Sequence, residues 1–154
     1  MGTPQAVATT NFTLKLTNSQ GQFATKAFTI IVVNPPVITT GDLPYLITGT
    51  AIPAASATYK LAATAGSGTI ATTGTVWTVD ASTPLPAGIT LNAATGQLSG
   101  TPTVTGTFAI KFNVVDSNLI TDTKSIQLPI YANPTITTPA SLSVASAIAI
   151  APIT

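Results

Sequence analysis

The chain has 154 residues, of which 45% are apolar and only 6% are charged, so it can build a core beneath an unusually uncharged surface. Cysteine, histidine, arginine and glutamate are absent, which excludes disulfides, thiolate zinc sites, cysteine nucleophiles and a histidine general base. The net charge of +1 leaves no basic patch for nucleic acid. Threonine is abundant, with 31 residues, and its β-branched side chain suits strands. The composition therefore favours strands and leaves no candidates for a hydrolytic triad, so we expect no enzymatic activity and no cofactor.

The first part of the chain predicts a β-hairpin. Residues 8–17 alternate between apolar and polar side chains, as a half-buried strand does. A turn is expected at 18–21, and residues 24–33 form the returning strand. Two prolines follow in Asn34-Pro-Pro36, and since proline cannot donate to a β-ladder, the strand is expected to end there at a stiff junction.

Similar features recur after about 98 residues. Gly2-Thr-Pro4 matches Gly100-Thr-Pro102, and Ile38-Thr-Thr40 matches Ile136-Thr-Thr138, at the same offset and without a gap. A fixed period of this length predicts a tandem array of modules. We therefore expect three parts: the C-terminal strands of a preceding module (1–34), one complete module (35–133) and the N-terminal strand or strands of a following module (134–154).

The central period predicts many short strands and no helix. Strands are expected at 37–40, 45–51, 57–63, 75–79, 89–91 and 97–99, followed by a long strand from 104, a turn at 116–118 and a return at 123–131. This pattern predicts an antiparallel Ig-like β-sandwich. Trp77 lies at the centre of one short strand and is expected to fill the core between the two sheets.

One stretch, from Leu85 to Phe108, packs short strands and turns closely together. Its Leu-Pro-Ala-Gly and Ser-Gly-Thr-Pro segments, preceded by Trp-Thr-Val and followed by Val-Val-Asp-Ser, resemble the putative Ig domain (He_PIG) family of bacterial surface proteins. The resemblance implies a non-catalytic module, similar to cadherin-like and Ig-like sandwiches. The signature residues are Trp77, Leu85, Pro86, Gly88, Leu91, Gly96, Leu98, Gly100, Pro102 and Phe108.

Two kinds of binding site have candidate residues. Calcium prefers several carboxylate oxygens, and the weak candidates are Asp116 and Asp122, which flank one hairpin, with Asp42 at a module boundary. The competing interpretation is that Asp116 caps a turn through the backbone, as Asn18 would at the matching position. Stacking on sugar rings is the second possibility, and the aromatic candidates are spread along the chain: Tyr45, Tyr59, Trp77 and Tyr131.

The expected function is structural. We predict a spacer module of an extracellular bacterial repeat protein, such as an adhesin stalk or surface filament, whose partners are neighbouring Ig-like modules. The most apolar stretch, 142–153, is shorter than the roughly twenty residues of a membrane span, so no membrane insertion is expected. The alternatives are a module that binds a glycan or a protein, and a filament subunit in which copies complete one another by strand addition.

Overall fold

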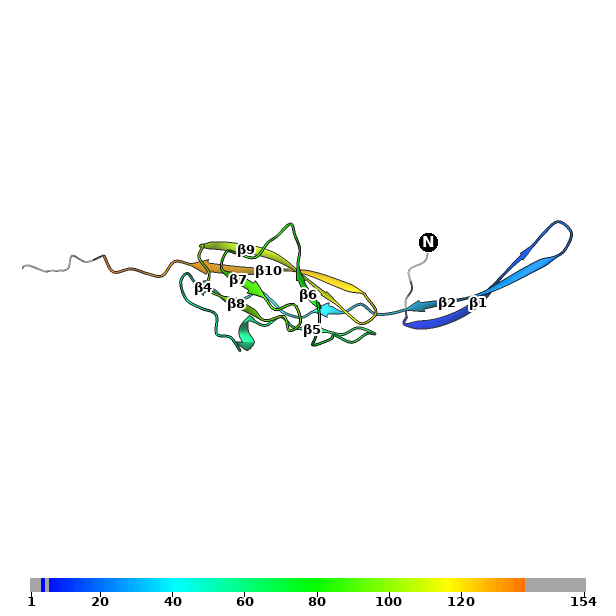
Figure 1. The fold of residues 1–154 in the computed structure, drawn as a ribbon, viewed down its shortest axis with the longest axis horizontal. Helices are drawn as coiled ribbons and strands as arrows, with labels where there is room; N and C mark the ends of the chain where they lie inside the picture. The colour runs from blue at the N-terminus through cyan, green and yellow to red at the C-terminus, as the bar shows by residue number, and fades with distance from the viewer. Residues whose placement is uncertain (1–3, 5, 138–154) are drawn as a thin grey trace, which may run out of the picture.

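The computed structural model describes residue 4 and residues 6–137, and this part of the chain is built from β-strands (Figure 1). The elements in chain order are β1 (Ala8–Thr17), β2 (Phe23–Val32), β3 (Val37–Ile38), β4 (Leu46–Ile47), the 3₁₀ helix η1 (Ala57–Tyr59), β5 (Ala63–Thr64), β6 (Trp77–Val79), β7 (Ile89–Leu91), β8 (Leu98–Gly100), β9 (Gly106–Val115) and β10 (Thr121–Tyr131).

The long hairpin β9–β10 is the main support of the module. Its strands pair antiparallel from Val115 opposite Thr121 to Gly106 opposite Ile130. Successive strand residues point to opposite faces, and on one face the apolar side chains are buried. These buried side chains are Ile110, Phe112, Val114, Ile126, Leu128 and Ile130.

The core lies between this hairpin and a second layer of short ladders. β4 and β6 extend the hairpin into a four-stranded sheet of order β4-β10-β9-β6. The other layer contains the ladders β3–β5 and β7–β8, and isolated bridges place Ile52 opposite Gly100 and Lys60 opposite Gln97. Side chains of both layers form one apolar cluster that includes Ile38, Leu98 and Trp77. The predicted Ig-like β-sandwich is therefore the observed fold class.

Several short elements differ from their predicted bounds. The predicted strand 57–63 is wrong over most of its length, because Ala57–Tyr59 form η1, Lys60 makes only an isolated bridge to Gln97, and β5 begins at Ala63. The strand predicted at 45–51 is reduced to β4, which pairs parallel with β10 in an otherwise antiparallel sheet. Alternation describes which residues face a core, but it does not identify the neighbouring strand.

The hairpin β1–β2 pairs with no other strand of the described residues. It projects beyond the end of the module where the chain enters β3 (Figure 1). Its ten residue pairs run from Ala8 opposite Val32 to Thr17 opposite Phe23, and most of its side chains are exposed.

Candidate functional site

The signature stretch folds back on itself where two glycines meet. In the β7–β8 ladder Ile89 lies opposite Gly100, and the Thr101 N–H donates to the Gly88 carbonyl at 2.9 Å. Gly88 (φ +88°) and Gly100 (φ +109°) both have left-handed backbone angles. A Cβ at Gly88 would lie 1.9 Å from the Thr101 carbonyl oxygen, and one at Gly100 would lie 2.1 Å from that of Gly88. Only glycine fits at either position.

The turn after β7 places a third glycine against the tryptophan. The Asn92 Oδ1 accepts hydrogen bonds from the Ala94 and Thr95 N–H groups at 3.0 and 3.1 Å, as in an Asx turn. Gly96 (φ +74°) follows, and a Cβ there would lie 3.1 Å from the Trp77 ring. Trp77 is only 3% exposed, so the ring is held in the core against this turn.

The other signature residues also pack. Leu98 is completely buried, and Pro86 and Pro102 are buried beside the paired glycines. Leu85, Leu91 and Phe108 are partly buried against the core. The signature residues are thus apolar or glycine, and the structure gives them a role in packing.

The structure separates the candidate calcium ligands. The Asp42 Oδ1 accepts from the Gln127 N–H at 2.9 Å, and the Asp122 Oδ2 accepts from the Ile38 N–H at 2.8 Å. Within residues 4 and 6–137, no three metal-ligating side chains gather. The fourth aspartate, Asp80, accepts hydrogen bonds from the Ser82 hydroxyl and N–H, which lower the pKa of its carboxyl. Of the candidate ligands, Asp42 thus bonds the loop after β3 to β10, and Asp122, which lies in β10, bonds to β3.

Asp116 supports the turn between β9 and β10. Its Oδ1 accepts from the Asn118 and Ile120 N–H groups, each at 2.9 Å. The side chain is 4% exposed, and its Oδ2 has no hydrogen-bond partner. Gly68 leaves the room for this carboxylate, because a Cβ there would lie 2.5 Å from Oδ2.

Substitutions of Asp116 test this capping role. We expect Asp116→Ala to lower the free energy of unfolding by about 2–3 kcal/mol, because two backbone donors lose their acceptor. Asp116→Asn should cost less than about 1 kcal/mol, because an amide oxygen accepts the same bonds. Urea denaturation measures both. Equal losses would contradict a capping role, and a calcium-dependent rise in melting temperature that the Asn variant loses would favour the calcium interpretation.

A hydrogen-bonded junction fixes the chain where it enters the module. The Asn34 N–H donates to the Ser67 Oγ at 2.8 Å, and the Ser67 N–H donates back to the Asn34 carbonyl at 3.0 Å. Two further bonds join the same loop to the β9–β10 turn, from the Ser117 N–H to the Thr69 carbonyl at 2.9 Å and from the Thr69 N–H to the Ser117 Oγ at 3.0 Å. A Cβ at Gly66 would lie 2.1 Å from the Asn34 carbonyl oxygen, so the chain passes against a glycine.

At this junction the sequence predicts a stiff strand end at Asn34-Pro-Pro36, but it does not predict that the loop around Ser67 holds it. The one available signal is the Gly-Ser-Gly sequence, because glycines on both sides of a residue are typical where backbones approach closely. The partner could not be predicted, since Asn34 lies 33 positions away in the sequence.

The aromatic candidates for sugar binding are divided between the core and the surface. Trp77 is in the core, whereas Tyr45 and Tyr131 are 60% and 54% exposed and their ring centroids lie 5.7 Å apart. The Tyr59 hydroxyl donates to the Tyr45 carbonyl at 2.9 Å, and burial, with a smaller contribution from Tyr45, raises the pKa of that hydroxyl. The structure thus brings together two tyrosines that are far apart in sequence, but without the tryptophan.

The fold and the glycine-rich signature define an Ig-like β-sandwich module, a class used by many cell-surface domains. The profile of the family described as Putative Ig domain (He_PIG) matches residues 35–131. The chain therefore belongs to this family. A comparison with curated proteins gives no match.

Solved structures with similar backbones come from different kinds of protein. A protein described as a putative alpha-galactosidase from Bacteroides fragilis is 18% identical, with 62% of this chain and 17% of that chain covered and a TM-score of 0.47. The extracellular cadherin domains 1–4 of protocadherin gamma B7 are 15% identical, with 81% and 32% covered and a TM-score of 0.43. The chain thus spans at most about a third of either protein, and likenesses of this size carry no argument about activity.

The described residues contain no helix of the length and apolarity that crossing a membrane requires.

Proposed function

We propose that this chain is a non-catalytic spacer segment of an extracellular bacterial repeat protein. In this proposal residues 35–133 are one complete module, 1–34 are the last strands of a preceding module, and 134–154 begin the next. The observation that carries the proposal is the reciprocal hydrogen bonding between Asn34 and Ser67. A spacer must hold the direction between neighbouring units, and these bonds act at the boundary itself.

The positions of the two module ends also support a spacer. The chain enters beside the β9–β10 turn, to which the junction loop is bonded through Thr69 and Ser117. It leaves at the opposite end of β10, where Tyr131 pairs with Ile47 (Figure 1). Modules joined in this way follow one another along the long axis, so each added module extends the array.

The entry segment is further stiffened by its own residues. Pro36 is buried, and its ring holds the backbone close to one φ value. Two residues later β10 holds the backbone of Ile38 from both sides, because Asp122 accepts from its N–H and the Lys124 Nζ donates to its carbonyl at 3.3 Å. Bending at this boundary would break several of these bonds together.

Spin labels test the stiffness of the junction directly. The sequence has no cysteine, so Thr9→Cys and Thr105→Cys place two unique labels, one on β1 and one at the far end of the module. We expect a narrow distribution of distances between the labels in pulsed electron resonance. Ser67→Ala should broaden it, since the Asn34 N–H then loses an acceptor worth about 1 kcal/mol.

Ser125→Ala is the matched control, because this exposed serine of β10 lies outside the junction. A broad distribution in the unchanged protein would contradict the spacer proposal. An equal effect of both serine variants would contradict the part assigned to Ser67.

A further inference from the structure

The β1–β2 hairpin has the same geometry as β9–β10, displaced by 98 positions. Adding 98 to the bounds of β1 gives those of β9, Gly106–Val115. The register agrees as well, since Ala8 opposite Val32 corresponds to Gly106 opposite Ile130. The agreement extends over all ten pairs, down to Thr17 opposite Phe23 and Val115 opposite Thr121.

The turns of the two hairpins are equivalent in detail. The Asn18 Oδ1 accepts from the N–H groups two and four residues later, at 3.0 and 2.9 Å, as the Asp116 Oδ1 does. Leu119 (φ +61°) is the one non-glycine residue with a left-handed angle among the described residues. Its counterpart Gly21 has φ +81°. The first hairpin is therefore built as the closing hairpin of a module.

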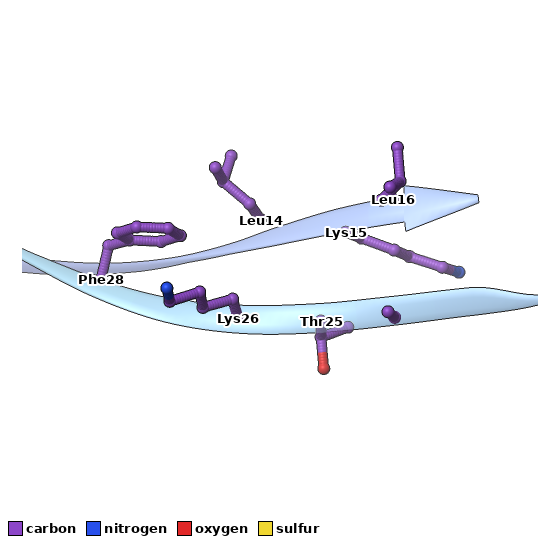
Figure 2. A pocket seen from close by; sticks show the side chains of 7 residues that line it. Leu14, Lys15, Leu16, Thr25, Lys26 and Phe28 are labelled. Atoms are coloured by element: carbon purple, nitrogen blue, oxygen red, sulfur yellow. The ribbon is translucent and has the colours of Figure 1, made fainter. Parts of the chain in front are cut away.

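The two hairpins differ in what covers them. Leu14 is 56% and Leu16 is 78% exposed, whereas their counterparts Phe112 and Val114 are completely buried. The same contrast holds for three further pairs: Phe12 and Ile110, Phe28 and Ile126, Ile30 and Leu128. Leu14, Leu16 and Phe28 rise together from one side of the hairpin, while Thr25 points to the other (Figure 2).

The complete module indicates what covers such a face. There β6 pairs antiparallel with β9 and places Trp77 opposite Val114, and β4 pairs parallel with β10 at Ile130. The Lys124 Nζ donates to the Ile38 carbonyl of β3. In the first hairpin the corresponding edges, Leu14–Leu16 for β6 and Val32–Val33 for β4, pair with no other strand of the described residues. The counterpart of Lys124 is Lys26, whose Nζ lies over the Phe28 ring at 5.3 Å from its centroid.

We infer that the apolar face and both edges of β1–β2 bind an Ig-like segment equivalent to residues 37–105, a module without its closing hairpin. The inference rests on the proposed array and identifies the surface through which that array is completed. A hollow of about 390 Å³ lined by Leu14, Leu16, Lys26 and Phe28 lies on this face. The large side chain equivalent to Trp77 belongs beside Leu16, the counterpart of Val114.

Other segments of a second copy fit this surface less well. The segment 37–105 of another copy is already paired with that copy's own β9–β10. Residues 134–154 correspond to 36–56 at the same offset, so they include no equivalent of the strand that carries Trp77. The geometry therefore favours a whole half-module over a single added strand.

An extended chain tests the inference. In this chain a second copy of residues 37–105 replaces residues 1–7 and ends directly before Ala8. Because Ala8 corresponds to Gly106, the added copy precedes β1 at the same spacing at which residues 37–105 precede β9. In this chain we expect the amide hydrogens of β1 and β2 to exchange at least about 100-fold more slowly than in the unextended chain, since covered strands open only with the whole module. Hydrogen exchange followed by NMR resolves the two hairpins separately.

One residue on each face of the hairpin gives a matched pair of variants in the extended chain. Leu14→Asp puts a charge on the apolar face and should abolish the added protection. Thr25→Asp puts the same charge on the opposite face and should leave the protection within about threefold of the parent, because its counterpart Thr123 donates to Asn113 within the hairpin itself.

Each outcome bears on the inference. Fast exchange of β1–β2 in the extended chain, while β9–β10 stays protected, would overturn it, and so would an added segment that stays unfolded. Protection in the unextended chain that grows with protein concentration would overturn it in favour of a second copy, with sedimentation as the check. The spin-label experiment uses the unextended chain and is therefore independent of this one. A narrow distribution of label distances, combined with fast amide exchange of β1–β2 in the extended chain, would contradict the docking surface but not the spacer proposal.

Discussion

Replacing Gly88 by alanine is expected to destabilise the module by more than about 4 kcal/mol, a loss few single substitutions cause. The left-handed backbone accounts for about 1–2 kcal/mol of this loss. The larger part is steric, because the new Cβ would lie 1.9 Å from the Thr101 carbonyl oxygen. Relieving that contact requires breaking the bond from the Thr101 N–H to Gly88, together with the pairing of Ile89 with Gly100. Urea denaturation followed by circular dichroism measures the effect.

Gly74 provides the matched control for this substitution. It has nearly the same backbone angle, φ +82°, but a Cβ there would meet nothing within 4 Å. Gly74→Ala should therefore show only the backbone contribution of about 1–2 kcal/mol. If both variants lost the same stability, the close approach of the two signature strands would not be the reason for glycine at position 88.

Replacing Trp77 by alanine is expected to cost about 3–5 kcal/mol, the usual loss for a large buried aromatic side chain. The ring is 3% exposed and belongs to the single apolar cluster that joins both layers. Its neighbours cannot collapse into the vacated space easily, because Gly96 has no side chain to move and Val114 is held in β9. Denaturation followed by far-ultraviolet circular dichroism is the measurement, since the variant loses its only tryptophan.

The adjacent residue is a control from the same strand. Thr78 is exposed, and its hydroxyl only accepts a long bond of 3.4 Å from the Asn113 Nδ2. Thr78→Ala should change stability by less than about 0.5 kcal/mol. A loss from Thr78→Ala as large as that from Trp77→Ala would mean that the strand, and not the ring in the core, is the sensitive feature.

The interior of the module depends on its signature glycines and on Trp77, whereas the junction with the preceding chain depends on Ser67. Gly88 and Gly100 allow a backbone approach that no other residue permits, and Gly96 lies in close contact with the Trp77 ring. Ser67 and Asn34 then join one unit to the chain before it. Both sets of interactions depend on geometry and not on charge, so they do not require more than the 6% of charged residues that the chain contains.

The long hairpins and their turns could be predicted from local patterns. Alternation identified the core face of β9 and β10, since side chains of a strand point to opposite sides with a period of two. Asn18 and Asp116 marked the turns because short polar side chains bond to nearby backbone. These interactions span at most a few residues, so the sequence contains all the information that they require.

The short strands around them could not be predicted as well. Residues 57–63 form only an isolated bridge from Lys60 to Gln97 and the start of β5 at Ala63. Hydrogen bonds from the Gln97 Nε2 to the Ser56 and Tyr59 carbonyls, each at 3.2 Å, hold η1 in place of a ladder. The parallel pairing of β4 with β10 joins residues more than eighty positions apart. A local pattern contains no information about such partners.

The sequence by itself determined the all-β class, the family resemblance, the main hairpins and the glycine-rich signature, since these depend on residue type and on contacts between near neighbours. Only the tertiary structure decided that Asp42, Asp116 and Asp122 each bond to different backbone groups, and that Ser67 holds Asn34. It also decided that the apolar residues of β1–β2 lie exposed while the same positions of β9–β10 lie in the core. The physical reason is that burial depends on which distant segments pack together, and two hairpins of nearly the same pattern differ only in whether such a segment covers them.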